Sequence, residues 1–95
     1  MATLSEDEIR TALEDLTGWD LVDGQITKEY RLGGFAGAIA FVVRLSYEAE
    51  AANHHPDLEI HYDKVRVTLS THSEGGVTTK DLDLAAAIED VVPAQ

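Results

Sequence analysis

Apolar residues recur at helical spacing near the start of the chain, at Ile9, Leu13 and Leu16. Steps of three or four positions are typical of one face of an α-helix. Ser5 followed by Glu8 forms a capping box before this run, and Gly18 offers a left-handed stop after it. The pattern predicts a first helix that begins after Ser5 and ends at Gly18.

Two short β-prone runs follow, at residues 19–22 and 25–31, and Asp23-Gly24 separates them. An Asp-Gly pair between two such runs is typical of a tight hairpin turn. We therefore expect two antiparallel strands, closed by Gly33 and Gly34.

Residues 35–53 contain "FVVRL", which taken alone would suit a strand. Over the longer range the apolar residues keep helical steps, at Phe35, Ile39, Val42, Leu45, Ala49 and Ala52. Alanine also favours helix. We expect one long helix that ends near 53–55, because Pro56 disfavours helix in the residue before it.

Apolar and polar residues then alternate, with the apolar positions at Leu58, Ile60, Tyr62, Val65, Val67 and Leu69. Asp63-Lys64 divides this run, which predicts a second hairpin with one buried face. Residues 72–78 are expected to form a loop. Thr78 can then cap a last helix that has Asp81 at its N3 position, with an apolar stripe at Leu82, Ala85, Ile88 and Val92.

The predicted order is α-β-β-α-β-β-α, in a single domain that covers residues 1–95. Four mainly antiparallel strands with three helices on one face make a two-layer α+β fold. The other face of the sheet must meet solvent or another chain. A small sheet with an open edge, next to a long apolar helix, predicts a homodimer or homotetramer.

Eighteen Asp and Glu residues against seven Lys and Arg give a net charge of −11. Such a surface repels phosphate backbones, so we expect no nucleic-acid partner. The chain has no cysteine, which excludes disulfides, zinc–thiolate sites and a thiol nucleophile. Acidic residues near Met1 do not suit a signal peptide, and the longest apolar stretch is too short to span a bilayer. We expect a cytoplasmic protein without a membrane partner.

All four histidines fall within "HHPDLEIHYDKVRVTLSTH". Glu50 and His54 are four positions apart, so on a continuous helix they share a face. His54 and His55 lie where the helix dipole favours a protonated imidazole. Pro56 turns the chain into the second hairpin, whose far end returns His72 to the same corner.

The loop after His72 and the start of the last helix, with Asp81, should close this corner. The sequence thus predicts a pocket of three histidines and two carboxylates. Imidazole exchanges protons near neutral pH, which suits acid–base catalysis. The same groups would also suit zinc or another divalent ion. Adjacent histidines tend to point apart, however, and no HxH or HExxH spacing occurs, so we expect no metal. His61 lies outside this set.

The stretch resembles the pterin-4a-carbinolamine dehydratase family. The resemblance is carried by an acid, three residues, His-His-Pro, an aromatic residue and a later His and Asp, here Glu50, His54-His55-Pro56, Tyr62, His72 and Asp81. The segments "KVRVTLSTH" and "GGVTTKDLDLA" are also similar to the family. The resemblance implies dehydration of 4a-hydroxytetrahydrobiopterin to quinonoid dihydropterin, a step in tetrahydrobiopterin recycling that uses no cofactor.

By this resemblance, His54 is the main acid–base group and His72 is the second, on the other side of the pterin. His55 and Pro56 are expected to bind the substrate. Glu50 is assigned a catalytic role, supporting His54 or contacting the pterin. Asp81 is expected at the binding site, where it steadies His72 or the loop.

Leu58 departs from the family, which commonly has a bulky aromatic residue at this place. This puts one wall of the expected pocket, and with it substrate preference, in doubt. The resemblance also connects the pathway to an aromatic amino-acid hydroxylase. The alternative function is a non-enzymatic pterin-binding or dimerisation-cofactor module, since animal members of the family also serve a homeodomain transcription factor in that way.

Overall fold

The computed structural model describes residues 2–93. Within them, the predicted order of three helices and four strands is confirmed. The helices span Glu6–Leu13 (α1), Phe35–Ala52 (α2) and Thr79–Asp90 (α3). The strands span Asp20–Val22 (β1), Gln25–Arg31 (β2), Asp57–His61 (β3) and Lys64–Leu69 (β4), and a 3₁₀ turn (η1) covers His72–Glu74.

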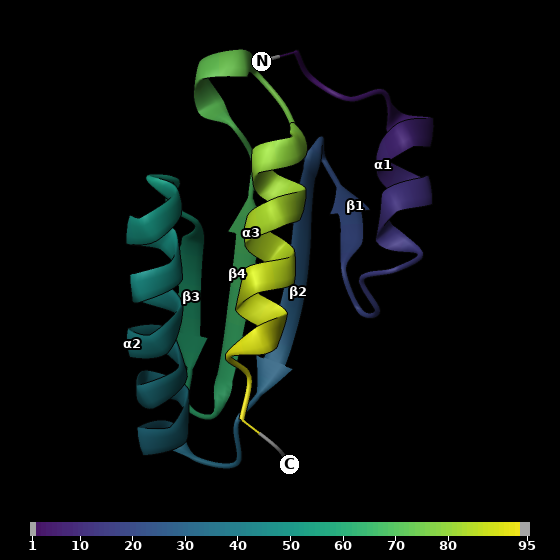
Figure 1. The fold of residues 1–95 in the computed structure, drawn as a ribbon. Helices are drawn as coiled ribbons and strands as arrows, with labels where there is room; N and C mark the ends of the chain where they lie inside the picture. Colours follow the sequence, from purple (N-terminus) through teal and green to yellow (C-terminus); the bar gives the residue numbers. More distant parts are fainter. Residues whose placement is uncertain (1, 94–95) are drawn as a thin grey trace.

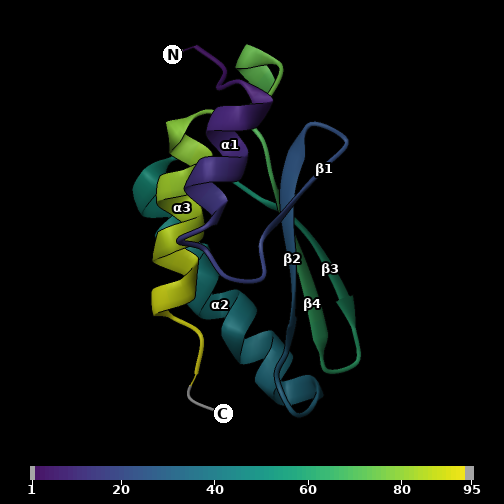
Figure 2. The same ribbon diagram turned by 90° about the vertical axis from the view of Figure 1, so that its right-hand side faces the viewer.

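The strands form one sheet in the order β1-β2-β4-β3, and each neighbouring pair is antiparallel. The helices lie on one face of this sheet, as predicted (Figures 1 and 2). β2 and β4 occupy the centre, where six register pairs join them. β1 and β3 are the edge strands. The architecture is therefore the two-layer α+β fold expected from the sequence.

Three local predictions are confirmed at the level of individual residues. Ser5 and Glu8 form the expected capping box of α1. Asp23 and Gly24 both have positive φ, 52° and 77°, which is the backbone of a type I′ hairpin turn. Thr78 caps α3 in a second capping box.

The predicted end of the first helix at Gly18 is wrong, because α1 ends at Leu13. The next three amides, including that of Leu16, bind to carbonyls three residues back at 3.0–3.3 Å. The chain therefore tightens into turns after α1, and Gly18, with φ +89°, ends those turns. Leu16 still packs against the core.

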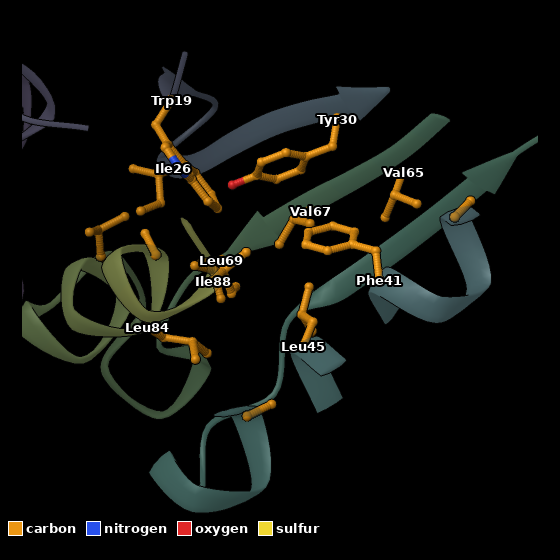
Figure 3. Packing of buried hydrophobic residues seen from close by; sticks show 14 of the residues in the cluster. Trp19, Ile26, Tyr30, Phe41, Leu45, Val65, Val67, Leu69, Leu84 and Ile88 are labelled. Carbon is orange, nitrogen blue, oxygen red and sulfur yellow. The ribbon is translucent and has the colours of Figure 1, made fainter. Parts of the chain in front are cut away.

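The core lies between the sheet and the helices. Figure 3 shows Phe41 and Leu45 of α2 directed toward the central strands, where Val67 is fully buried. The rings of Tyr30 and Phe41 lie 4.9 Å apart at their centroids. These contacts, together with Leu84 and Ile88 of α3, fix the two layers against each other (Figure 3). Burial of this kind is the main stabilising contribution in a domain of this size.

Only one of the two strands of the second hairpin is buried as expected. Val65, Val67 and Leu69 of β4 are buried, as the alternation predicted. Every residue of β3 is exposed, however, including Leu58 and Ile60 at 36% and 37%. The prediction of a buried face is therefore wrong for β3, because this strand is at the edge of the sheet and the helical layer leaves it uncovered.

Candidate active site

The position of His54 is set by the way α2 ends. Asn53 adopts a left-handed conformation, φ 49° and ψ 45°, which asparagine tolerates better than most residues. The amide of His54 then binds the carbonyl of Ala49 at 3.0 Å, and the amide of Asn53 binds that of Glu50 at 3.1 Å. These two bonds form a Schellman motif, so the chain leaves the helical path at Asn53, immediately before His54.

The hairpin brings the far end of β4 to this corner, as predicted. Asp57, the first residue of β3, pairs with Thr68 near the end of β4. The chain after β4 therefore passes beside the turn at Pro56. This register places residues 70–73 next to the end of α2.

His54, His55 and His72 lie around one hollow of about 280 Å³. The full lining is Asn53, His54, His55, Ser70, Thr71, His72, Ser73 and Lys80. His54 is buried, whereas His55 and His72 are exposed. His61 is elsewhere, exposed on β3 with its Nε2 3.7 Å from Oε2 of Glu59. The structure thus gathers the three predicted histidines and leaves out the fourth.

Asp81 lies behind His54 rather than in the hollow. Its Oδ1 is 2.5 Å from Nε2 of His54, and its side chain is fully buried. Its Oδ2 accepts bonds from the Thr71 hydroxyl at 2.8 Å and from the Thr78 amide at 2.9 Å. The expected contact with His72 is replaced by one with His54, while the expected support of the loop is present. Both carboxylate oxygens are occupied within the protein.

Glu50 contacts His55 instead of His54. Its Oε2 lies 2.5 Å from Nε2 of His55, and both side chains are largely exposed, at 74% and 61%. The expectation that Glu50 shares a face with His54 is wrong, because the helix stops at Ala52 and the left-handed Asn53 redirects the next residues. Pro56 is partly buried and does not line the hollow.

Sequence reasoning did not single out Ser70, Thr71 and Lys80, which line the hollow, or the bond of Thr78 to Thr71 behind it. Thr78 was identified only as a helix cap. The capping box of Thr78 and Asp81 did signal that the carboxylate turns back toward the cap. No sequence pattern signals that its other oxygen reaches His54.

A larger hollow, of about 450 Å³, lies between α1, the Asp23-Gly24 turn and residues 75–77. It contains no histidine, and its charged side chains include the exposed Glu6–Arg10 pair at 2.9 Å. Size alone would favour this hollow as a ligand site. The groups able to move protons lie at the smaller one, so we assign the chemistry there.

Among residues 2–93, no cluster of three or more His, Asp or Glu side chains has an arrangement that could hold a metal ion. In the same part of the chain, no helix has the length and apolar character needed to cross a membrane.

Comparison with known proteins decides the family. The profile of the pterin 4 alpha carbinolamine dehydratase family matches residues 2–91. The chain belongs to this family. A relative from Roseiflexus castenholzii, provisionally named pterin-4-alpha-carbinolamine dehydratase, is 50% identical over 91 residues, which are 96% of this chain and 98% of the relative. One from Herpetosiphon aurantiacus with the same provisional name is 48% identical over 94 residues, covering 99% and 98%.

Solved structures agree. A transcriptional coactivator/pterin dehydratase from Brucella melitensis superposes with a TM-score of 0.90 at 36% identity, over 96% of this chain and 99% of that one. A pterin dehydratase-like protein described as a RuBisCO assembly factor of the alpha-carboxysome gives a TM-score of 0.64 at 19% identity, covering 81% and 89%. The second likeness shows a shared fold alone.

Leu58 is the residue expected to depart from the pattern of the pterin-4a-carbinolamine dehydratase family. The structure places Leu58 on β3, paired with Val67 and outside the lining of the histidine hollow. Leu58 is 36% exposed and adds apolar surface to the edge strand. Within this chain, Leu58 therefore does not form the pocket wall that was expected of it.

Proposed function

We propose that this protein is a 4a-hydroxytetrahydrobiopterin dehydratase, which converts the carbinolamine to quinonoid dihydropterin and water. In this reaction the C4a–O bond breaks, a C4a=N5 double bond forms, and N5 loses its proton. The catalyst must deliver one proton to the departing hydroxyl and accept one from the ring nitrogen. Imidazole groups can do both near neutral pH.

The observation that carries this proposal is the gathering of His54, His55 and His72 around one hollow in a member of this family. His54 is the main acid–base group, because a buried carboxylate orients its ring. His72 is the second acid–base group. His55, paired with Glu50, binds and orients the pterin. Tetrahydrobiopterin recycling beside an aromatic amino-acid hydroxylase is the pathway that we propose for it.

In this proposal, Asp81 and Pro56 do not contact the substrate. Both oxygens of Asp81 are bound within the protein, so it acts through His54. Pro56 fixes the turn between α2 and β3. Glu50 acts through His55, the residue that it contacts.

The test is the rate of quinonoid dihydropterin formation from freshly generated 4a-hydroxytetrahydropterin, compared with the rate in buffer. The wild-type protein should be faster, and His54→Ala should lower turnover by about 10²–10⁴-fold. His61→Ala is the matched control, since His61 is exposed on β3 away from the hollow. A wild-type protein no faster than buffer, or a His54→Ala variant equal to wild type, refutes the proposal.

A non-enzymatic module is the alternative, and it predicts a different pair of results. Such a protein would bind pterin, or a partner protein, without accelerating dehydration. Titration of the same preparation with a pterin, followed by fluorescence, separates binding from catalysis. Binding without acceleration would favour the module.

A further inference from the structure

Hydrogen bonds link two buried hydroxyl groups to Asp81, which lies behind His54. Thr71, Thr78 and Asp81 are 4%, 0% and 0% exposed. The hydroxyl oxygens of Thr71 and Thr78 lie 2.8 Å apart, and that of Thr71 lies 2.8 Å from Oδ2 of Asp81. The amide of Lys80 reaches the Thr78 hydroxyl at 3.2 Å. This hydrogen-bonded network joins the segment after β4 to the first turn of α3.

The direction of each hydrogen bond follows from counting protons. Oδ2 of Asp81 receives both the Thr78 amide and the Thr71 hydroxyl, so it acts purely as an acceptor. The single hydroxyl proton of Thr71 is then used, and Thr71 can only accept from Thr78. Thr78 in turn accepts from the Lys80 amide. These donors are thus all directed toward Oδ2 of Asp81, as suits a carboxylate at a helix N-terminus.

We take Asp81 as the ionised acceptor that its two donors at Oδ2 suit, and this choice sets the proton on His54. An ionised Asp81 accepts from Nε2 of His54, so Nε2 carries the hydrogen and Nδ1 of the neutral ring does not. Among residues 2–93, Nε1 of Trp19 is the only buried side-chain nitrogen or oxygen without a hydrogen-bond partner. Within residues 2–93, the side chain of His54 bonds through Nε2, and its Nδ1 is not among the buried atoms that lack a partner, so Nδ1 is the ring nitrogen left to face the hollow that His54 lines.

We infer that Thr71 and Thr78 are positioning residues, which hold Asp81 so that His54 presents an unprotonated Nδ1 to the substrate. The substrate is that of the proposed function, on which this inference rests for its reaction. The neutral ring can then accept the N5 proton at Nδ1, while Asp81 stabilises the imidazolium that forms. Without the Thr71 hydroxyl, Asp81 loses one of its three donors and the ring loses a fixed orientation.

Thr71→Val removes this hydroxyl while keeping the shape of the side chain. It should lower kcat by about 10- to 100-fold, the usual cost of losing an orienting partner, with KM changed less than kcat. Thr71→Ser should restore most of the rate. Thr27→Val is the matched control, because Thr27 also shares a hydroxyl contact, 3.2 Å from Thr68, but lies on β2 away from the hollow. It should leave kcat unchanged.

Nitrogen-15 NMR of His54 provides a readout that does not depend on turnover. In the wild-type protein at a pH where the ring is neutral, Nε2 should be protonated and its hydrogen should exchange slowly with water. In Thr71→Val that hydrogen should exchange much faster. If the wild-type protein proves inactive, the proposed function fails, but this comparison still decides whether Thr71 positions His54.

The inference is overturned if Thr71→Val keeps both the wild-type kcat and the slowly exchanging Nε2 hydrogen. It is also overturned if Thr71→Ser is as impaired as Thr71→Val, because the hydroxyl would then not be the group that matters. Thermal unfolding checks that each variant folds. Should Thr71→Val not fold, Thr71→Ala removes the same hydroxyl without β-branching and is measured in the same two ways.

Discussion

Nε2 of His54 lies 2.5 Å from Oδ1 of Asp81, although the two residues are 27 positions apart in the chain. Both are buried, and the contact joins the end of α2 to the first turn of α3. The same carboxylate completes the capping box of α3 with Thr78. One side chain therefore both starts a helix and orients the imidazole proposed to move protons.

Asp81→Asn should lower kcat strongly. An amide has the size of a carboxylate, but it cannot accept all three donors that converge on Asp81. A misdirected imidazole typically loses on the order of 10²–10⁴-fold in rate. Asp83→Asn is the control, because Asp83 is an exposed carboxylate on the same helix. Steady-state dehydration kinetics on both variants make the comparison, and an Asp81→Asn variant with the wild-type kcat would contradict the assigned role.

Substitution of the other two histidines of the hollow should affect kcat and KM differently. His72→Ala should lower kcat by less than His54→Ala does, because His72 is exposed and has no buried carboxylate to fix its ring among the described contacts. His55→Ala should chiefly raise KM, since its exposed ring is proposed to hold the pterin. Initial rates over a range of substrate concentration give both constants. A His55→Ala variant with unchanged KM would remove its binding role.

The fold was predictable because each element carries a local signal. From Phe35 to Ala52 the apolar residues recur at steps of three and four. This pattern outweighed the strand-like "FVVRL", and the structure has one helix there. Asp23-Gly24 specified its own turn through the backbone conformations that these residues tolerate. Such signals act between residues that are close in the sequence, so they can be recognised without knowledge of the tertiary structure.

The contacts of the site were less predictable, because single residues redirect the chain. The helical spacing of Glu50 and His54 failed once Asn53 turned left-handed, and Glu50 met His55 instead. Asparagine permits that conformation without requiring it. The pairing of Asp81 with His54 depends on how α3 docks beside the end of α2, which no local pattern specifies.

We propose that the protein forms a homodimer or homotetramer through α2 and β3. Four large apolar residues of α2 are 37–71% exposed and four positions apart, namely Phe35, Ile39, Val43 and Tyr47. Leu58 and Ile60 of the uncovered edge strand are also exposed. Exposed apolar side chains on a helix and on an unpaired strand edge suit a second copy of the chain.

Val43→Glu should shift this assembly toward monomer. A charge in the middle of the apolar stripe would have to be buried without a partner. Ala86→Glu is the control, because Ala86 is an exposed helical residue on α3, outside the stripe. Light scattering at micromolar concentration measures the mass of each protein. A wild-type species of only 10.3 kDa would contradict the proposed assembly.

Chelation should leave the dehydratase activity unchanged. The proposed reaction needs proton transfer alone, and the paired contacts of His54 with Asp81 and of His55 with Glu50 already occupy one nitrogen of each ring. Activity is measured before and after exhaustive dialysis against a chelator, and again after adding back single divalent ions. Loss on chelation followed by recovery with one specific ion would favour a metal site instead.

The hydrogen bonds of Glu89 should make the stability of the protein depend on pH. Glu89 accepts from the Tyr30 hydroxyl and from Nζ of Lys28 at 2.9 Å. Burial raises the pKa of Glu89, but the bonds from Tyr30 and Lys28 outweigh burial and hold the pKa below its usual value of 4.5. A carboxyl whose pKa is lower in the folded state stabilises that state above the pKa of the unfolded chain, and this contribution is lost as pH falls through the folded pKa.

Glu89→Gln should therefore lower the free energy of unfolding by about 1 kcal/mol at pH 7. The difference from wild type should shrink as the pH falls through the lowered pKa of the folded Glu89, because the wild-type carboxyl then becomes neutral as well. Glu29→Gln is the matched control, since Glu29 forms an exposed pair with Arg66 at 3.3 Å, and exposed pairs contribute little. Urea unfolding of the three proteins at pH 7 and pH 3 measures these differences. An equal loss at both pH values would mean that Glu89 stabilises the fold by packing rather than by its charge.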